Sequence, residues 1–470
     1  MGIAFNLKKV LDRKEWEMMT PSPITNATAH FTITDPSGED KSIMLVAGAS
    51  SIYRYDAHQD GWQQLPNSGI AGTFGAGSCG TFHCNGASGT ATAGTTTTIA
   101  TNLTLNRSIK GYKVRITAGT NAGEERIISS NTLGSNSVLT VTTPFSSAIT
   151  TSSVYLLLTG RYWFFNAGTS AVGFSYYERA LNTSTSRSVT GLQVSFGTEG
   201  RLCATWNNSD YSFSTGTVSS ATATTLVSSS KTWTSSQWIN YQVRIISGTG
   251  VGQLRTITAN TANSLTVATW TTNPDTTSVF AISGNEDNLY LFGNNSTTVY
   301  KYSISGNSWT TLSPSVARGG AFAVGGGANW VSNVSDSIWT NESAIINGRR
   351  IYSFRGGASA VLDYYDIPSN SWVSLTYSPQ MDTFTTGSCY DYDEDYIMIS
   401  KENTGRLFRY IISENRLIPF STLVYPNGVA TVGDKMFTKV LIDGETIIRW
   451  VYVLGHTNTL LFRCMMIDKD

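Results

Sequence analysis

The chain has 470 residues and no net charge, with 32 Lys and Arg residues balanced by 32 Asp and Glu residues. Charged residues make up only 14% of the chain, against roughly 25% in an average soluble protein, which excludes a strongly basic nucleic-acid-binding surface. Aromatic residues reach 11%, which excludes a largely disordered chain. The chain is longer than a single hydrophobic core usually supports, so we expect several domains or one large closed architecture.

The beginning of the chain carries no predicted targeting or membrane segment. Residues 1–20 are charged and lack an apolar stretch before a small-residue cleavage site, so no signal peptide is expected. No run of about 18 apolar residues occurs anywhere, so no membrane span is predicted. Cys79 and Cys84 are close enough in sequence to pair, but without a secretory signal we favour free buried thiols.

One strand pattern occurs four times along the chain. In each copy the last aromatic residue is followed seven residues later by Trp or Leu, and ten residues later by Leu or Phe. The copies are residues 52–55 with Trp62 and Leu65, 299–302 with Trp309 and Leu312, 362–365 with Trp372 and Leu375, and 407–410 with Leu417 and Phe420. Turn residues separate the two halves, and another strand precedes each copy, so each unit is predicted to be a four-stranded antiparallel sheet. The predicted core residues are Tyr55, Tyr302, Tyr365, Tyr410, Trp62, Trp309 and Trp372.

This pattern resembles the kelch repeat, in the Tyr-x-Tyr strand, the Trp-x-x-Leu that follows, and the Gly-rich end of the preceding strand. Gly-rich ends occur at Phe292-Gly293 and Arg355-Gly356-Gly357. The resemblance implies an all-β propeller. The key residues are Tyr55, Tyr177, Tyr302, Tyr365 and Tyr410, with Cys464 in the last equivalent position. Their separations predict about six blades, provided that the two longest spacings contain insertions.

Two segments resemble each other and account for those long spacings. Residues 112–116 match residues 241–245, and residues 139–141 match residues 265–267. Between these stretches, Gly119, Gly123 and Arg126 correspond to Gly248, Gly252 and Arg255. We therefore predict small β-modules at 91–158 and 221–282, each inserted before the second strand of a blade. The propeller is predicted to comprise residues 1–90, 159–220 and 283–470.

The two ends of the chain are predicted to complete the last blade together. After Cys464 the expected Trp would fall at position 471, whereas Trp16 and Met19 near the N-terminus match the Trp-x-x-Leu element. We expect residues 16–19 to pair with residues 460–467, which include Phe462 and Cys464. This pairing would close the ring and remove two open sheet edges.

The sequence nominates no catalytic residue, metal ligand or cofactor site. The four histidines (His30, His58, His83 and His456) are isolated, and no pair of carboxylates is marked out for glycoside hydrolysis. The acidic residues 391–395 could bind calcium, but the turns of neighbouring repeats are also charged, so a solvated hairpin turn is the favoured interpretation. No enzyme activity is therefore predicted.

The two modules resemble small β-modules that recur in particle proteins of tailed bacteriophages. The resemblance rests on the Gly-Thr-x-x-Gly, Arg and Leu-Thr-Val pattern that both modules contain. It implies a structural protein of the tail, neck or capsid exterior, which is assembled in the host cytoplasm and present in multiple copies per virion. Its expected partners are other virion proteins, with no direct contact to nucleic acid.

Three other functions stay open on the sequence. A receptor- or carbohydrate-binding tail protein would use exposed aromatic side chains against a host surface glycan or receptor, and Trp233, Trp238 and Trp270 are the candidates for that surface. A glycan-active enzyme would require turnover of a host polysaccharide. A bacterial kelch-like interaction protein would share the fold without the virion.

Overall fold

The computed structural model describes the chain in twenty segments. They are residues 17–24, 43–48, 51–56, 59–75, 78–167, 172–192, 200–204, 214–293, 298–314, 330–332, 350–354, 361–367, 369–376, 390–393, 396–401, 406–411, 414–420, 435–443, 446–454 and 461–466. These residues contain 37 β-strands and no α-helix, and the strands form eight antiparallel sheets. The prediction of an all-β chain is confirmed.

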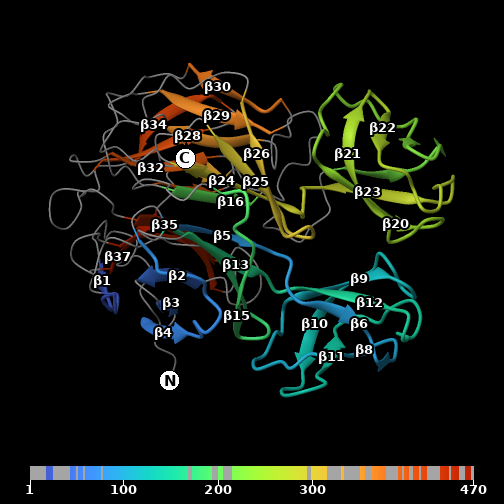
Figure 1. The fold of residues 1–470 in the computed structure, drawn as a ribbon, viewed down its shortest axis with the longest axis horizontal. Helices are drawn as coiled ribbons and strands as arrows, with labels where there is room; N and C mark the ends of the chain where they lie inside the picture. The colour runs from blue at the N-terminus through green and yellow to red at the C-terminus, as the bar shows by residue number, and fades with distance from the viewer. Residues whose placement is uncertain are drawn as a thin grey trace.

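Five of the sheets pair their strands in chain order, and each is named here after its first strand (Figure 1). The β2 sheet contains β2 (Ile43–Gly48), β3 (Ser51–Asp56) and β4 (Gly61–Leu65), and the β5 sheet contains β5 (Cys79–His83), β13 (Arg161–Ala167), β14 (Val172–Glu178) and β15 (Thr183–Ser186). The β16 sheet contains β16 (Gly200–Ala204), β24 (Asn288–Gly293), β25 (Val299–Ser303) and β26 (Ser308–Leu312). The β27 sheet contains β27 (Trp330–Ser332), β28 (Arg350–Phe354), β29 (Leu362–Asp366) and β30 (Ser371–Leu375), and the β31 sheet contains β31 (Tyr390–Asp393), β32 (Tyr396–Lys401), β33 (Arg406–Ile411) and β34 (Arg416–Phe420).

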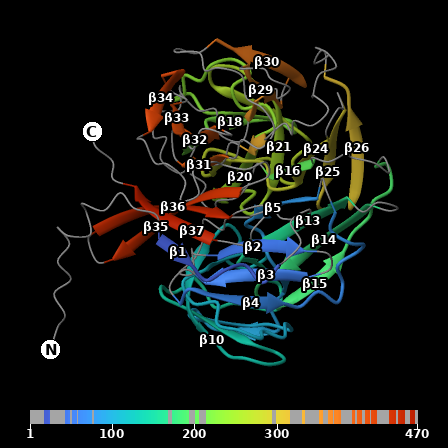
Figure 2. The same ribbon diagram turned by 90° about the vertical axis from the view of Figure 1, so that its left-hand side faces the viewer.

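A sixth sheet joins the two ends of the described chain. This β35 sheet contains β35 (Lys435–Asp443), β36 (Thr446–Leu454) and β37 (Leu461–Met466), and its fourth strand is β1 (Glu17–Met19). Met18 lies opposite Phe462 and Met19 lies opposite Leu461 in the antiparallel register (Figure 2). The N-terminal strand therefore takes the outer place that a fourth strand from the chain end would otherwise hold.

The first strands of successive sheets lie against one another. β5 contacts β16, β16 contacts β27, β27 contacts β31, and β31 contacts β35. These five sheets consequently follow one another in space in the order in which they occur in the chain.

The two remaining sheets have seven strands each and form module 1 (residues 88–158) and module 2 (residues 214–283). Module 1 contains β6 (Ser88–Thr90), β7 (Ala93–Gly94), β8 (Thr98–Ala100), β9 (Lys113–Ala118), β10 (Glu125–Asn131), β11 (Val138–Val141) and β12 (Val154–Leu158). Module 2 contains β17 (Ser214–Thr217), β18 (Ser220–Ala221), β19 (Thr225–Val227), β20 (Gln242–Ser247), β21 (Leu254–Asn260), β22 (Ser264–Val267) and β23 (Val279–Ser283). Their strand orders are equivalent, and each sheet starts a few residues before the boundary expected from the sequence.

Both modules are inserted at the same point of neighbouring sheets. Module 1 lies in the chain between β5 and β13, which pair with each other, and module 2 lies between β16 and β24, which also pair. Figure 1 shows both modules on the same side of the molecule. Because a module begins and ends on adjacent antiparallel strands, its insertion leaves the pairing of the host sheet intact.

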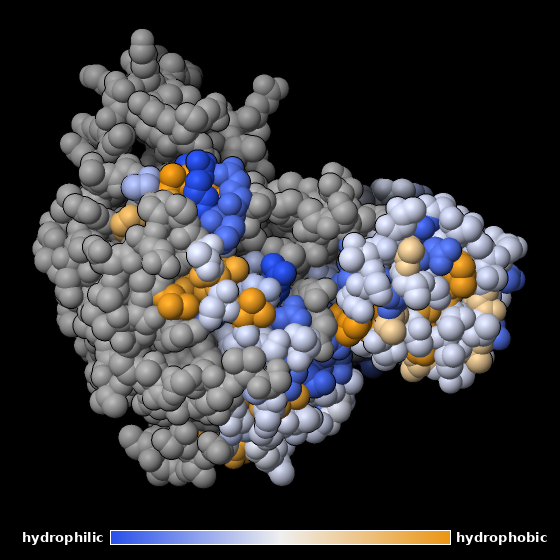
Figure 3. Space-filling model, turned by 90° about the horizontal axis from the view of Figure 1, so that it is seen from above, coloured by the Kyte–Doolittle hydropathy of each residue, from blue (hydrophilic) through white to orange (hydrophobic). Residues whose placement is uncertain are grey.

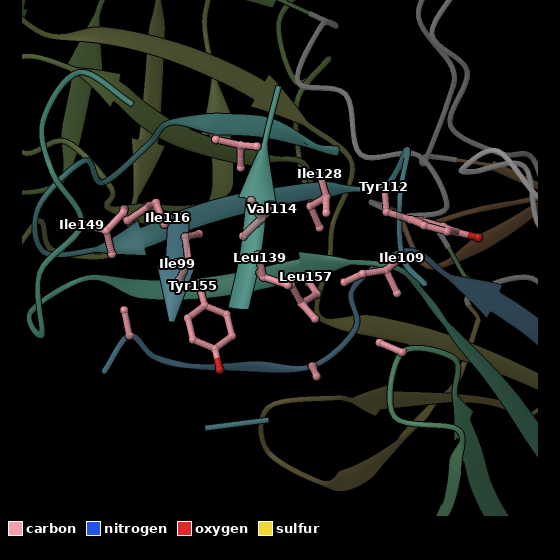
Figure 4. Close-up of a cluster of buried hydrophobic side chains, with 14 of the residues drawn as sticks. Ile99, Ile109, Tyr112, Val114, Ile116, Ile128, Leu139, Ile149, Tyr155 and Leu157 are labelled. Carbon is pink, nitrogen blue, oxygen red and sulfur yellow. The ribbon is translucent and has the colours of Figure 1, made fainter. Parts of the chain in front are cut away.

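Each module has its own hydrophobic core, as Figure 4 shows for module 1. In β9, Val114 and Ile116 point into this core and are fully buried. This period-two alternation is what a strand with one face against a core requires. Arg115, between them, points to the opposite face and is nevertheless fully buried, so something other than the module's own core covers it.

Removal of β1 tests how strongly the N-terminal strand stabilises the fold. A chain that lacks residues 1–20 loses the buried Met19 and the hydrogen bonds between Thr20 and the turn at Asp60. We expect a loss of roughly 2–3 kcal/mol in the free energy of unfolding, from burial of one Met side chain and a few hydrogen bonds. Deletion of residues 1–15 keeps β1 and serves as the control. Equal thermal unfolding curves for the two truncations would contradict a stabilising role of β1.

Candidate functional site: the junction of the two modules

The backbone conformation explains why the motif shared by the modules has glycine at its first position. Gly119 and Gly248 both have φ near +77°, which disfavours any residue with a side chain. A β-carbon added at Gly119 would collide with the carbonyl oxygen of Ser152, and one added at Gly248 would collide with that of Thr277. Glycine is therefore required at this corner in both modules.

The motif arginine also has the same role in each module. Arg126 and Arg255 each donate a hydrogen bond from Nε to the backbone carbonyl of the residue before an aromatic ring, at 2.9 and 3.0 Å. Their guanidinium carbons lie 5.1 Å from the centre of the Phe145 ring and 5.5 Å from that of the Trp270 ring. Both arginines thus fasten an adjacent loop through a hydrogen bond and a cation–π contact.

The second motif glycines bring the two modules together. A β-carbon at Gly123 would lie 2.8 Å from the carbonyl oxygen of Ile246, and one at Gly252 would lie 3.0 Å from that of Thr117. Positions in the two motifs differ by 129, so Thr117 and Ile246 are equivalent residues. The contact is therefore reciprocal, as in a pseudo-two-fold pair.

A single buried carboxylate lies between equivalent arginines of the two modules. Glu286, in the segment that connects module 2 to β24, accepts from Arg115 Nη1 at 3.1 Å and from Arg244 Nη2 at 2.8 Å. Both arginine side chains are at most 2% exposed, and that of Glu286 is 8% exposed. Asn85 Nδ2 donates to the same carboxylate at 3.2 Å, and Glu125 pairs with Arg115 Nε at 2.5 Å.

Electrostatics keep this carboxylate charged although it is buried. Burial disfavours the ionised form of Glu286, but the guanidinium groups of Arg244 and Arg115 outweigh burial and hold its pKa below the ordinary value. Burial lowers the pKa of Arg115, and Glu125 and Glu286 oppose that shift. Breaking such a buried network by removal of one partner typically costs about 3–5 kcal/mol.

His83 and Cys84 line the junction from the end of β5. Burial lowers the pKa of His83 to about 4, against the opposing influence of Glu286. Its Nδ1 accepts a hydrogen bond from the Asn85 amide at 3.3 Å. Burial also raises the pKa of the Cys84 thiol well above its ordinary value. His83 and Cys84 are therefore neutral at pH 7, while the charge at the junction belongs to the Arg115, Arg244, Glu125 and Glu286 network.

Sequence reasoning missed this junction. Arg115 and Arg244 had been matched as equivalent positions in a repeat, yet Glu286 stood outside every motif. One signal was present: each arginine lies between two aliphatic residues of a strand, and thus on a face that an isolated module would expose to solvent. The burial of both arginines comes from the approach of the two modules.

The tyrosines predicted to lie in sheet cores are buried and share a hydrogen bond that the sequence analysis did not foresee. Each tyrosine hydroxyl donates to a side-chain oxygen five residues later, at 2.7 or 2.8 Å, and each acceptor residue has a positive φ, as suits Asn and Asp in tight turns. The pairs are Tyr55–Asp60, Tyr177–Asn182, Tyr302–Asn307, Tyr365–Asn370 and Tyr410–Asn415. The spacing of Tyr and Asn by five residues was visible in the sequence.

The predicted core tryptophans differ in burial. Trp309 and Trp372 are buried, at 9% and 7% exposed, whereas Trp62 is only partly buried. The indole Nε1 of Trp62 donates to the carbonyl of Thr20 at 3.0 Å, and that of Trp309 donates to the carbonyl of Ser188 at 2.8 Å. Both indoles thus contact the segment that follows the outer strand of another sheet.

The expectation that Trp233, Trp238 and Trp270 are exposed is wrong. They are 4%, 0% and 3% exposed and belong to the core of module 2. Trp233 packs edge-on against Trp238, with ring centres 6.3 Å apart. A small module of short strands needs large side chains to fill its interior, and these three indoles supply that volume. The receptor-binding alternative therefore loses the residues that the sequence had suggested for it.

The structure also locates the remaining residues that were singled out from the sequence. Cys79 and Cys84 are buried and do not form a disulfide, and Phe462 and Cys464 lie in β37. Trp16 lies outside the described residues. Within the acidic run, Asp391 and Asp393 lie in β31, and residues 394–395 fall outside the description. The described part of the chain contains no group of three or more His, Cys, Asp and Glu side chains that could hold a metal ion.

No helix of the described residues is long and apolar enough to cross a membrane.

No protein-family model and no curated protein matches the chain. Among solved structures, the crystal structure of the mitotic checkpoint complex aligns with 100% of this chain and 99% of its own, at 10% identity and a TM-score of 0.35. Kuenenia stuttgartiensis hydrazine synthase aligns over 38% of this chain and 46% of its own, at 10% identity and a TM-score of 0.20. Both scores are too low to inform the function.

Substitution of the first motif glycine tests its steric role. We expect Gly119→Ala to lower the free energy of unfolding by about 2 kcal/mol or more beyond Gly134→Ala, as measured by thermal unfolding. Gly134 also has a positive φ, but a β-carbon there would meet no atom within 4 Å. The control therefore carries the backbone strain without the collision. Equal losses for both variants would show that the collision with Ser152 is relieved at no cost.

The neutral state of His83 predicts a pH dependence of stability. The histidine titrates near pH 6.5 when unfolded and at about pH 4 when folded, so the unfolded chain binds more protons between these values. The free energy of unfolding should fall as pH decreases through this window, with a slope of up to about 1.4 kcal/mol per pH unit. His83→Asn should flatten the curve in denaturant titrations between pH 6.5 and 4. Parallel curves for the variant and the unmodified chain would disprove this origin.

Proposed function

We propose that the six sheets outside the modules are the blades of a closed, kelch-like, six-bladed β-propeller. The contacts between the first strands of successive sheets support this arrangement, since such strands line the centre of a propeller. The turn in which a tyrosine hydroxyl donates to Asn, or to Asp60 in the β2 sheet, occurs at the same place in five sheets and also supports it, because a propeller repeats one blade structure around an axis.

Contacts between neighbouring sheets support closure by β1. The residue after the outer strand of one sheet contacts the tyrosine-linked turn of the next at Ser313 with Asn370 and at Thr376 with Asn415. Thr20, directly after β1, contacts Asp60 of the β2 sheet at the equivalent place, but here the direction is reversed: the Thr20 backbone amide donates to the Asp60 carboxylate at 2.8 Å. In this proposal the β35 sheet is the last blade, and it meets the first blade through Thr20.

The chain acts, in this proposal, as a structural protein of a tailed-bacteriophage particle, at the tail, neck or capsid exterior. The observation that carries the proposal is the paired modules, whose shared motif resembles that of phage particle proteins and whose motif residues build both the module corners and the junction. The propeller binds neighbouring virion proteins, and the modules project from it. The protein has no catalytic role, and several copies occupy each virion.

In this proposal the modules offer a mainly polar surface to their partners. Figure 3 shows the projecting lobe of module 2 in mainly pale and blue colours, with few hydrophobic patches. Among described residues of the modules, the exposed large hydrophobic side chains are Ile127, Leu133 and Val251. Exposed threonines such as Thr222 and Thr224 offer hydroxyl groups for polar contacts.

Immunogold electron microscopy of purified particles tests this function. An antibody against the chain should label one fixed position on each particle, and that position assigns the protein to the capsid, the neck or the tail. An antibody against an unrelated host protein is the control for trapped material. Particles without label, with the antigen found only in cells, would overturn the proposal and leave a cellular interaction protein as the alternative.

A further inference from the structure

Four separate parts of the chain meet at Glu286. Module 1 contributes Arg115 and module 2 contributes Arg244, while Asn85 comes from the segment between β5 and module 1. Glu286 itself precedes β24, and its backbone amide donates to Gln242 Oε1 at 2.9 Å. The carboxylate thus links the two modules to each other and to both sheets from which they arise.

A second contact between the modules prevents rotation about this carboxylate. The loops at Gly123 and Gly252 touch reciprocally, as described above, and Ala122 lies against Gly252. Ala122 is 7% exposed, so the loop contact is itself closed to solvent. Two separate points of contact determine the relative orientation of two bodies far better than one point does.

The charge balance at the junction makes the modules depend on each other. Without Glu286, Arg115 would keep Glu125 as a carboxylate partner. The position in module 2 that corresponds to Glu125 is Leu254, so module 2 has no such carboxylate of its own at this place. Separation of the modules would break the buried ion pair between Arg115 of module 1 and Glu286, which is unfavourable.

We propose that Glu286 locks the two modules into a single rigid body that keeps a constant angle to the sheets below. We expect this rigid body to present both modules to a neighbouring virion protein at one angle, and that role rests on the proposed function. The lock itself does not depend on the proposed function.

Distances between spin labels in the purified full-length protein test the lock. Labels attached to p-acetylphenylalanine at the exposed positions Ser135 and Ala262, in modules 1 and 2, leave the cysteines untouched. The distance distribution from pulsed electron resonance should be narrow and unimodal in the unmodified chain. Glu286→Gln, which removes the charge but keeps the shape, should at least double its width.

Two further variants make the result decisive. Arg244→Met removes the ion pair between Glu286 and module 2 and leaves Glu286 paired with Arg115. It should broaden the distribution even if Glu286→Gln fails to fold. Glu414→Gln removes an exposed carboxylate that pairs with Arg416 outside the modules, and it should leave the distribution unchanged. An unchanged width in a folded Arg244→Met variant, checked by circular dichroism, would overturn the lock. This readout needs no virion, so it stands apart from the immunogold result.

Discussion

Burial of one carboxylate between two arginines is the interaction on which the arrangement of the modules depends. Charged groups enter a protein interior only when paired, and Glu286 satisfies Arg115 and Arg244 at the same time. The arginines occupy equivalent positions of a duplicated module, whereas the carboxylate belongs to the segment after module 2. The two arginines are therefore related by the near-two-fold symmetry of the modules, whereas Glu286 has no counterpart at the junction.

A second repeated interaction organises the rest of the chain. In five sheets a buried tyrosine donates a hydrogen bond to an Asn or Asp that has a positive φ. Four of these turn residues, Asp60, Asn307, Asn370 and Asn415, also contact the segment after the outer strand of another sheet, as Asn370 contacts Ser313. The same residue thus stabilises its own hairpin and determines the position of the next sheet. Where the chain runs from the β35 sheet to the β2 sheet, Thr20 and Asp60 make the corresponding contact. One local motif consequently serves both secondary and tertiary structure.

The tryptophans of module 2 show where composition misleads. An indole in a Ser- and Thr-rich segment stands out in the sequence and suggests a binding surface. Trp233, Trp238 and Trp270 are instead buried, because a module of short strands has few other large side chains with which to fill its core. Exposure depends on which face of a strand or loop meets the core, and isolated aromatic residues between irregular segments do not reveal that face.

Periodicity and spacing along the chain are enough to predict the all-β class, the repeat units with their core tyrosines, the duplication of the modules and the pairing of residues 17–19 with residues 461–463. The contact of Gly123 and Gly252 with the opposite module, the sharing of Glu286 by Arg115 and Arg244, and the neutral state of His83 beside them depend instead on how the folded parts pack together. Arg115 and Glu286 lie 171 positions apart in the chain, and no local pattern encodes the approach of two folded modules.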